Sequence, residues 1–179
     1  MRVCAIDPGK AGGVVIVQPN PPLLVEVLDL PLTDGEWDPV KVALICRCLS
    51  QYGVQRVIIE KVHAMPTSFR GGLGQFELAL IYGMWMAGLA SVAFESGIVV
   101  RPVHAATWKK VMGVLSPAPR QASAEEKQEA YKRRKLLAVE RAEQLFRRSF
   151  RTPRGRLMDG EAEACLLALY EDTLLGERS

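Results

Sequence analysis

Length, composition and charge favour one globular domain with a basic segment. The chain has 179 residues, 49% of them hydrophobic, which is enough for a single domain with its own core and too apolar for a disordered chain. The net charge is only +3, but residues 101–156 carry 15 lysines and arginines against 5 acidic residues, and the rest of the chain has a net charge of −7. Such a segment indicates a nucleic-acid contact surface, with a solvated helix face as the alternative.

The remaining composition favours a cytoplasmic protein. The longest apolar run, Ala79 to Phe94, is shorter than a membrane span and carries tyrosine, tryptophan, glycine and serine, so no membrane partner is expected. The N-terminus leads straight into a predicted strand, and no signal peptide is expected. Cys46 and Cys48 lack zinc-ligand spacing and only two histidines are present, so we expect the cysteines to be reduced core residues.

The first part of the chain is predicted to form three strands, a helix and a fourth strand. The strands cover residues 2–7, 12–18, 23–30 and 54–62. A Pro-Gly turn joins the first two strands as a hairpin. Asp38 is the predicted N-cap of the helix, with Pro39 at its first position, and the helix is expected to run to about Tyr52. This order fits a mixed sheet with a crossover helix.

The second part is predicted to contain one more strand among helices. The strand covers residues 98–103, and the helices cover about 75–95, 104–113, 125–148 and 158–175. Small residues in the first of these helices permit close packing, either in the core of one molecule or between two copies, and we favour the core. They are Ala79, Gly83, Ala87 and Gly88.

Four acidic residues fall at the ends of these elements. Asp7 ends the first strand and Glu60 lies near the end of the fourth, while Asp159 and Glu163 share one face at the head of the last helix. Carboxylates brought together repel one another unless cations lie between them, and Mg²⁺ prefers oxygen ligands. Two such ions about 4 Å apart can promote phosphodiester cleavage. The alternative is that each acid is an ordinary strand-end or helix-start residue.

With the acids placed on these elements, the chain resembles the RuvC family of Holliday-junction resolvases, in its phage-borne form, over nearly its whole length. The segments that carry the resemblance are Ala5–Gly9, Val57–Pro66, Thr107–Gly113 and Asp159–Ala164. The resemblance implies one ribonuclease H-like α/β domain over residues 1–179, with a five-stranded mixed sheet flanked by helices. It also implies a homodimer that nicks opposed strands of a four-way DNA junction, using two Mg²⁺ or Mn²⁺ ions per active site.

The resemblance also implies roles for particular residues. The metal ligands would be Asp7, Glu60, Asp159 and Glu163, although bacterial relatives often place the last two acids three residues apart instead of four. Lys109, or Lys110 beside it, and Lys135 would act on phosphate groups. Phe69 is the aromatic residue expected at the junction centre, with Phe76 as the alternative, and packing could explain either. The full set of expected DNA contacts is Phe69, Arg70, Lys109, Lys110, Lys132, Arg133, Arg134 and Lys135.

Three other functions are compatible with the same residues. One is a ribonuclease H-like nuclease that acts on forks or flaps. Another is a junction-binding or packaging accessory protein that keeps the acids without turning over substrate. An actin-like ATPase also begins with a strand-borne aspartate and a glycine turn, but this chain lacks a second Gly-rich phosphate loop and is short for that two-lobed fold.

Overall fold

A mixed sheet forms the centre of the protein. The computed structural model describes residues 1–62, 72–115 and 122–176. The five strands are β1 (Arg2–Asp7), β2 (Gly13–Gln18), β3 (Leu23–Leu28), β6 (Val54–Lys61) and β7 (Val99–His104). They are arranged in the order β3-β2-β1-β6-β7. β2 runs antiparallel to both β3 and β1, whereas β6 runs parallel to both β1 and β7. The predicted five-stranded mixed sheet is therefore confirmed.

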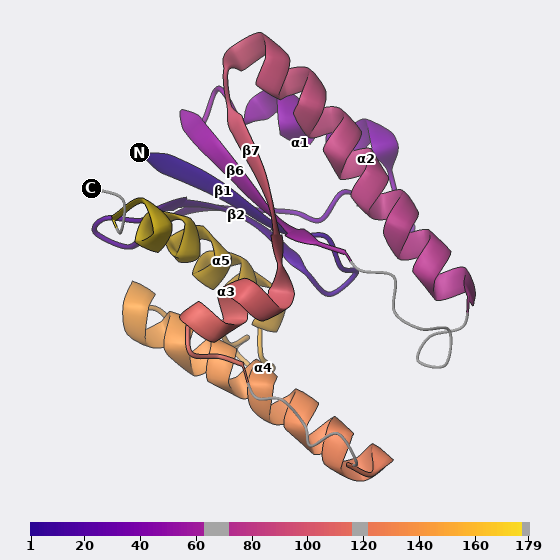
Figure 1. Ribbon diagram of the computed structural model, residues 1–179, viewed down its shortest axis with the longest axis vertical. Coiled ribbons are helices and arrows are strands. Elements are labelled where there is room, and N and C mark those ends of the chain that lie inside the picture. Colours follow the sequence, from indigo (N-terminus) through magenta and orange to yellow (C-terminus); the bar gives the residue numbers. More distant parts are fainter. Residues whose placement is uncertain (63–71, 116–121, 177–179) are drawn as a thin grey trace.

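Helices cover both faces of this sheet (Figure 1). They are α1 (Pro39–Cys48), α2 (Gly72–Ser96), α3 (Ala105–Val111), α4 (Ala124–Phe146) and α5 (Asp159–Gly176). The pair α1 and α2 lies on one face and α5 on the other, with α4 packed on the outer side of α5. Side chains therefore alternate along β1 between two cores, Val3 and Ala5 facing α5 while Cys4 and Ile6 face α1 and α2. Burial on both faces explains the continuous apolar runs of the central strands.

Local signals account for the first helix and for a small hairpin before it. The Asp38 carboxylate accepts a hydrogen bond from the Val40 amide at 2.8 Å, as expected for an N-cap, and the helix ends at Cys48 rather than near Tyr52. The strands β4 (Leu32–Thr33) and β5 (Glu36–Trp37) form a hairpin that was not predicted. Its signal is the Asp34-Gly35 pair, whose positive φ angles of 52° and 82° suit a tight turn.

The expectation that no apolar run is long enough to span a membrane is wrong for α2. Its segment Phe76–Ser96 meets the length and composition of a membrane-spanning helix, and it is the one such helix found among the described residues. One face of α2 nevertheless belongs to the core between the sheet and α1, where Ile81, Trp85 and Leu89 are buried. Removing α2 from the sheet would expose these side chains to solvent.

The small residues of α2 divide into two groups. Gly88 packs within the molecule, because a Cβ atom there would lie 3.0 Å from Sγ of Cys46 on α1. Ala79, Gly83 and Ala87 are exposed instead. The expectation that all four pack in the core is therefore wrong for three of them, since they lie on the side of α2 that faces away from the sheet.

A buried carboxylate ties α5 to two strands. Glu171 is 1% exposed. Its Oε1 accepts a hydrogen bond from Arg56 on β6 at 3.1 Å, and its Oε2 accepts one from Arg101 on β7 at 2.9 Å. A carboxylate at this depth is tolerated because two guanidinium groups compensate it. The two ion pairs fix α5, which carries two of the predicted acids, against β6, which carries a third.

Candidate active site

Asp7 and Glu60 emerge side by side from the sheet. Asp7 is the last residue of β1, and Glu60 is the next-to-last residue of β6. The two strands are parallel neighbours in which Ile6 pairs with Ile59. Because parallel strands end at the same edge of a sheet, both carboxylates reach that edge together. The structure therefore brings together the two strand-borne acids that the sequence predicted.

Two glycine contacts bring α5 to the same edge. A Cβ atom on Gly160 would lie 2.2 Å from the carbonyl oxygens of Ala11 and Gly12, and one on Gly13 would lie 2.7 Å from the carbonyl oxygen of Gly160. Only glycine permits backbone segments to approach this closely. The first turn of α5 therefore rests directly on the turn after β1, which places Glu163 near Asp7. Sequence reasoning did not assign this role to the glycine of the Asp159-Gly160 pair.

The electrostatics of Asp7 show that three of the acids are close neighbours. Burial, together with repulsion by Glu60 and Glu163, raises the pKa of Asp7 to about 7, against the opposing effects of Lys109 and the Gly9 amide. That amide donates to Oδ1 of Asp7 at 3.2 Å. A carboxylate whose proton affinity is raised by burial and by two neighbouring carboxylates marks a site suited to a cation.

The ammonium group of Lys109 is a cation that the protein itself places among these acids. Its Nζ atom lies 2.6 Å from Oε2 of Glu163 and 3.8 Å from Oε2 of Glu60. The side chain is buried, whereas the neighbouring Lys110 is exposed. Of the two lysines considered from the sequence, Lys109 is therefore the one that the fold directs at the acids.

Asp159, the fourth acid, is held from another direction. Its carboxylate forms an ion pair with Lys135 on α4. Partial burial lowers the pKa of Lys135, but the hydrogen bonds and charge of Asp159 and Tyr131 outweigh this effect and leave the pKa raised. Both lysines predicted from the sequence therefore contact predicted acids.

The structure also shows a contact that the sequence did not predict. The indole Nε1 of Trp108 donates a hydrogen bond to Oε2 of Glu60 at 2.9 Å. Trp108 immediately precedes Lys109 on α3, so this short helix supplies two neighbouring donors to the acids. The available signal was the tryptophan within the Thr107–Gly113 segment, which also fits an ordinary core residue.

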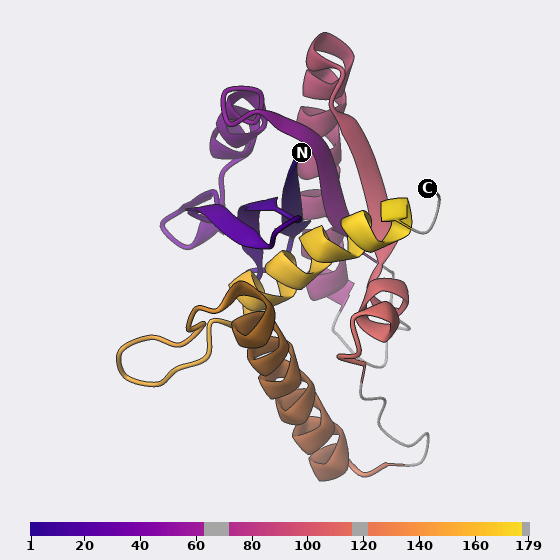
Figure 2. The same ribbon diagram turned by 90° about the vertical axis from the view of Figure 1, so that its left-hand side faces the viewer.

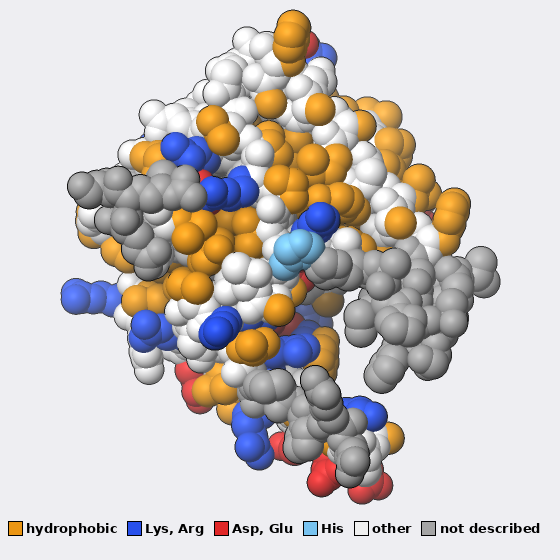
Figure 3. Space-filling model, viewed as in Figure 1, with side chains coloured by type: hydrophobic (Ala, Val, Ile, Leu, Met, Phe, Trp, Pro, Cys, Tyr) orange, Lys and Arg blue, Asp and Glu red, His pale blue; other side chains and the backbone are white. Residues whose placement is uncertain are grey.

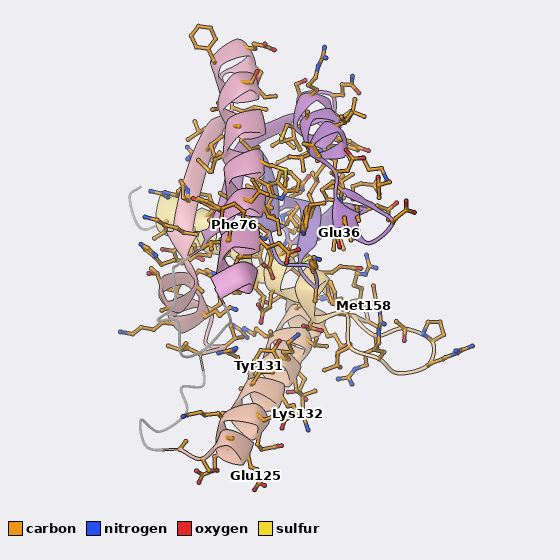
Figure 4. The ribbon with its side chains drawn as sticks, turned by 90° about the vertical axis from the view of Figure 1, so that its right-hand side faces the viewer. Glu36, Phe76, Glu125, Tyr131, Lys132 and Met158 are labelled. Carbon is orange, nitrogen blue, oxygen red and sulfur yellow. The ribbon has the colours of Figure 1, made fainter. Side chains whose placement is uncertain are left out.

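Other predicted residues lie apart from this centre or outside the described residues. Phe69 and Arg70 fall within 63–71, outside the described ranges. Phe76 is 70% exposed on α2. Lys132 and Arg133 are exposed on the part of α4 that extends away from the sheet, while Arg134 is half-buried (Figures 2 and 4).

Glu161 is a further acid in the first turn of α5. It lines a cleft of about 720 Å³ between the turn after β1 and the loop before α5. Its Oε2 is buried without a hydrogen-bond partner among the described residues. Burial raises the pKa of this carboxyl group, and Arg148 partly opposes the shift.

The chemistry of the acids fits a hard divalent cation, although the cage is not already assembled. Carboxylate oxygens are the ligands that Mg²⁺ and Mn²⁺ prefer. In the described part of the chain, no three histidine, cysteine or acidic side chains are already grouped as metal ligands. Lysines hold Glu163 and Asp159 instead. Binding of an ion by all four acids therefore requires these two carboxylates to exchange their lysine partners for the ion.

Comparison with known proteins identifies the fold. No protein-family model and no curated protein matches the chain. Among solved structures, Thermus thermophilus RuvC is similar with a TM-score of 0.64 and 18% identity, over 99% of this chain and 97% of that one. A second structure, T. thermophilus RuvC in complex with Holliday junction substrate, gives a TM-score of 0.60 at the same identity, over 99% and 96% of the two chains. The chain has a RuvC-like fold, which confirms the predicted ribonuclease H-like architecture.

The pKa of Asp7 predicts how stability depends on pH in the metal-free protein. The folded-state pKa of about 7 exceeds the ordinary value of 3.8. The native protein therefore retains a proton that the unfolded chain has lost, and Asp7 reduces stability as pH rises from about 4 to about 7. With EDTA at pH 8, we expect Asp7→Asn to melt at a higher temperature than the wild type, and this difference should shrink towards pH 4.

The matched control is Asp29→Asn, which changes an exposed aspartate. Its melting temperature should differ from that of the wild type by a similar amount at both pH values. If Asp7→Asn melted below the wild type at pH 8 in EDTA, the repulsion assigned to this site would be wrong.

Proposed function

We propose that this protein is a metal-dependent, structure-selective endonuclease that resolves four-way DNA junctions by paired symmetric nicks. The observation that carries the proposal is the convergence of Asp7, Glu60 and Glu163 at one edge of the sheet, with the Lys109 ammonium group among them. The RuvC-like fold supports it, and one similar structure is RuvC with a Holliday junction substrate. Neither likeness by itself assigns an activity to this chain.

The four acids would hold two Mg²⁺ or Mn²⁺ ions. Asp7 lies centrally, since both Glu60 and Glu163 repel it, and Asp159 would join after leaving Lys135. Two such metal ions, when bound, would supply an activated water and would stabilise the leaving oxygen. The protein must deprotonate Asp7 to provide this site, so binding should strengthen as pH rises through about 7.

The lysines have a second role once they leave the carboxylates. Lys109 and Lys135 lie beside the acids on two different helices, α3 and α4. Their ammonium groups would then be available to a DNA phosphate at the same place, where they would neutralise charge that develops during cleavage.

Basic residues around α4 would bind the arms of the junction. Lys132 and Arg133 are exposed on the protruding part of α4, and Arg151, Arg154 and Arg156 are exposed on the loop that follows it (Figure 2). Phosphate contacts of this kind position DNA without reading its sequence. Selectivity for a four-way junction would come from its shape.

The exposed side of α2 supports the predicted homodimer. Figure 3 shows hydrophobic side chains gathered over α2 and the adjacent edge of the sheet. Leu80 is 55% exposed and Phe94 is 93% exposed, and Gly83 and Ala87 lie exposed between them. Small residues between large apolar ones would let two helices approach closely. A two-fold dimer would place two active sites on opposed strands of the junction.

One observation favours a second function, that of a junction-binding protein without catalysis. Lysines already neutralise Glu163 and Asp159, and in such a protein these pairs would persist when DNA binds.

The phage-borne form and the cytoplasmic location stay predictions from the sequence.

The deciding experiment uses a labelled four-way junction and a matched linear duplex, with Mg²⁺ or EDTA. We expect symmetric nicks in the junction alone, only with metal, and none from Asp7→Asn, which should still bind the junction. Glu161→Gln, which changes an acid assigned no role in catalysis or DNA binding, should cut as the wild type does. Binding without nicking under Mg²⁺ or Mn²⁺ would support the accessory protein, and better cutting of forks or flaps would indicate a different branched-DNA nuclease.

The basic surface of α4 predicts a change in salt dependence. Replacing Lys132, Arg133 and Arg134 together by alanine should weaken junction binding and reduce the slope of log K against log salt by about 2 to 3, because each phosphate contact releases counterions. Arg47→Ala, an exposed change on α1 across the sheet, should leave the slope unaltered. An unchanged slope in the triple variant would mean that these residues face solvent in the complex.

The α2 surface predicts that one substitution disrupts self-association. Leu80→Glu should weaken dimerisation at least roughly tenfold in sedimentation equilibrium, since it buries an unpaired charge between the helices. Leu44→Glu on α1 is the matched control, because Leu44 and Leu80 are both 55% exposed. A monomeric wild type, or equal effects of the two substitutions, would contradict this assignment.

A further inference from the structure

A buried neutral donor holds one oxygen of Glu60. Trp108 is 1% exposed and belongs to the core between the sheet and α5, together with Met112 and Val114. From this packed position its indole Nε1 reaches Oε2 of Glu60 at 2.9 Å. The ring cannot turn freely in such a core, so the donor has a fixed direction.

The other two tryptophans show that this contact is not a general consequence of burying an indole. Nε1 of Trp37 and Nε1 of Trp85 are both buried without a hydrogen-bond partner among the described residues. An unpaired buried donor costs free energy, and the fold tolerates that cost twice. Trp108 differs because its donor is directed at a carboxylate of the acid cluster.

A neutral donor affects the acid differently from a lysine. Lys109 lies 3.8 Å from the same oxygen of Glu60, but its positive charge repels any arriving cation. The indole N–H carries no net charge and can keep its hydrogen bond while an ion binds. Since it engages Oε2 from a fixed position, it defines the orientation of the carboxylate.

We propose that Trp108 is a positioning residue that holds Glu60 in the orientation needed to bind a divalent cation. It acts through Glu60 and does not itself touch substrate or metal. The proposal depends on Glu60 being a metal ligand, as in the proposed function. Hydrogen-bond partners of metal ligands commonly alter affinity by about 10- to 100-fold when they are removed.

The test is Trp108→Phe, which keeps a buried aromatic ring and removes the donor. Mn²⁺ binding to the DNA-free protein, measured by calorimetry, should weaken about tenfold. The Mn²⁺ concentration for half-maximal junction nicking should rise in parallel, while the rate at saturating Mn²⁺ stays close to that of the wild type. Trp85→Phe makes the same change at a buried indole without a partner, and its Mn²⁺ affinity should equal that of the wild type.

The outcomes separate this proposal from the proposed function. If the wild type binds Mn²⁺ and the two tryptophan variants bind it equally well, Trp108 does not position Glu60, although the metal site stands. A wild type that binds no divalent cation would overturn both.

A second measurement applies if Trp108→Phe does not fold. In nitrogen–proton spectra of the wild type, the indole N–H signal of Trp108 should shift as Mg²⁺ is added, while that of Trp85 stays in place. An unmoved Trp108 signal at saturating Mg²⁺ would overturn the proposal. The signals can be assigned with Trp85→Phe and Trp37→Phe.

Discussion

Electrostatic repulsion among carboxylates at one edge of the sheet is the constraint on which the rest of this structure depends. Burial and the charges of Glu60 and Glu163 raise the pKa of Asp7, and Lys109, which is paired with Glu163, opposes part of that shift in the protein alone. A fold gains nothing in stability from such a cluster. The proposed role as a site for divalent cations and phosphate would account for the cluster, and the surrounding elements hold the acids together.

Three features of the backbone and core maintain this cluster. The parallel pairing of β1 with β6 sets two acids side by side, and the contact between Gly160 and the turn after β1 brings the first turn of α5 against them. At the far end of α5, Glu171 binds arginines on β6 and β7. The helix that carries the remaining acids is thus fixed at both ends, so their positions follow from the fold and not from loop conformation.

Sequence patterns predicted the five strands of the central sheet and the helices because these depend on local periodicity, whereas the lysines that contact the acids were predicted from the resemblance to the RuvC family. Sequence patterns did not predict contacts that depend on tertiary packing. The hydrogen bond from Trp108 joins residues 48 positions apart, and nothing local distinguishes this tryptophan from Trp85. The choice of Lys109 over Lys110 needed the orientation of α3. The exposure of Gly83 needed the orientation of α2, since a stripe of small residues suits a core and an interface equally well.

The central claim is that the acids form a cation site, and that the Lys109 ammonium group takes the place of the metal ion when none is bound. Anomalous diffraction from crystals grown with Mn²⁺ tests it most directly. We expect an anomalous peak against Asp7 and Glu60, with the Lys109 ammonium group moved away from Glu163. Crystals at saturating Mn²⁺ that show no peak at this edge, with Lys109 still paired to Glu163, would contradict the account.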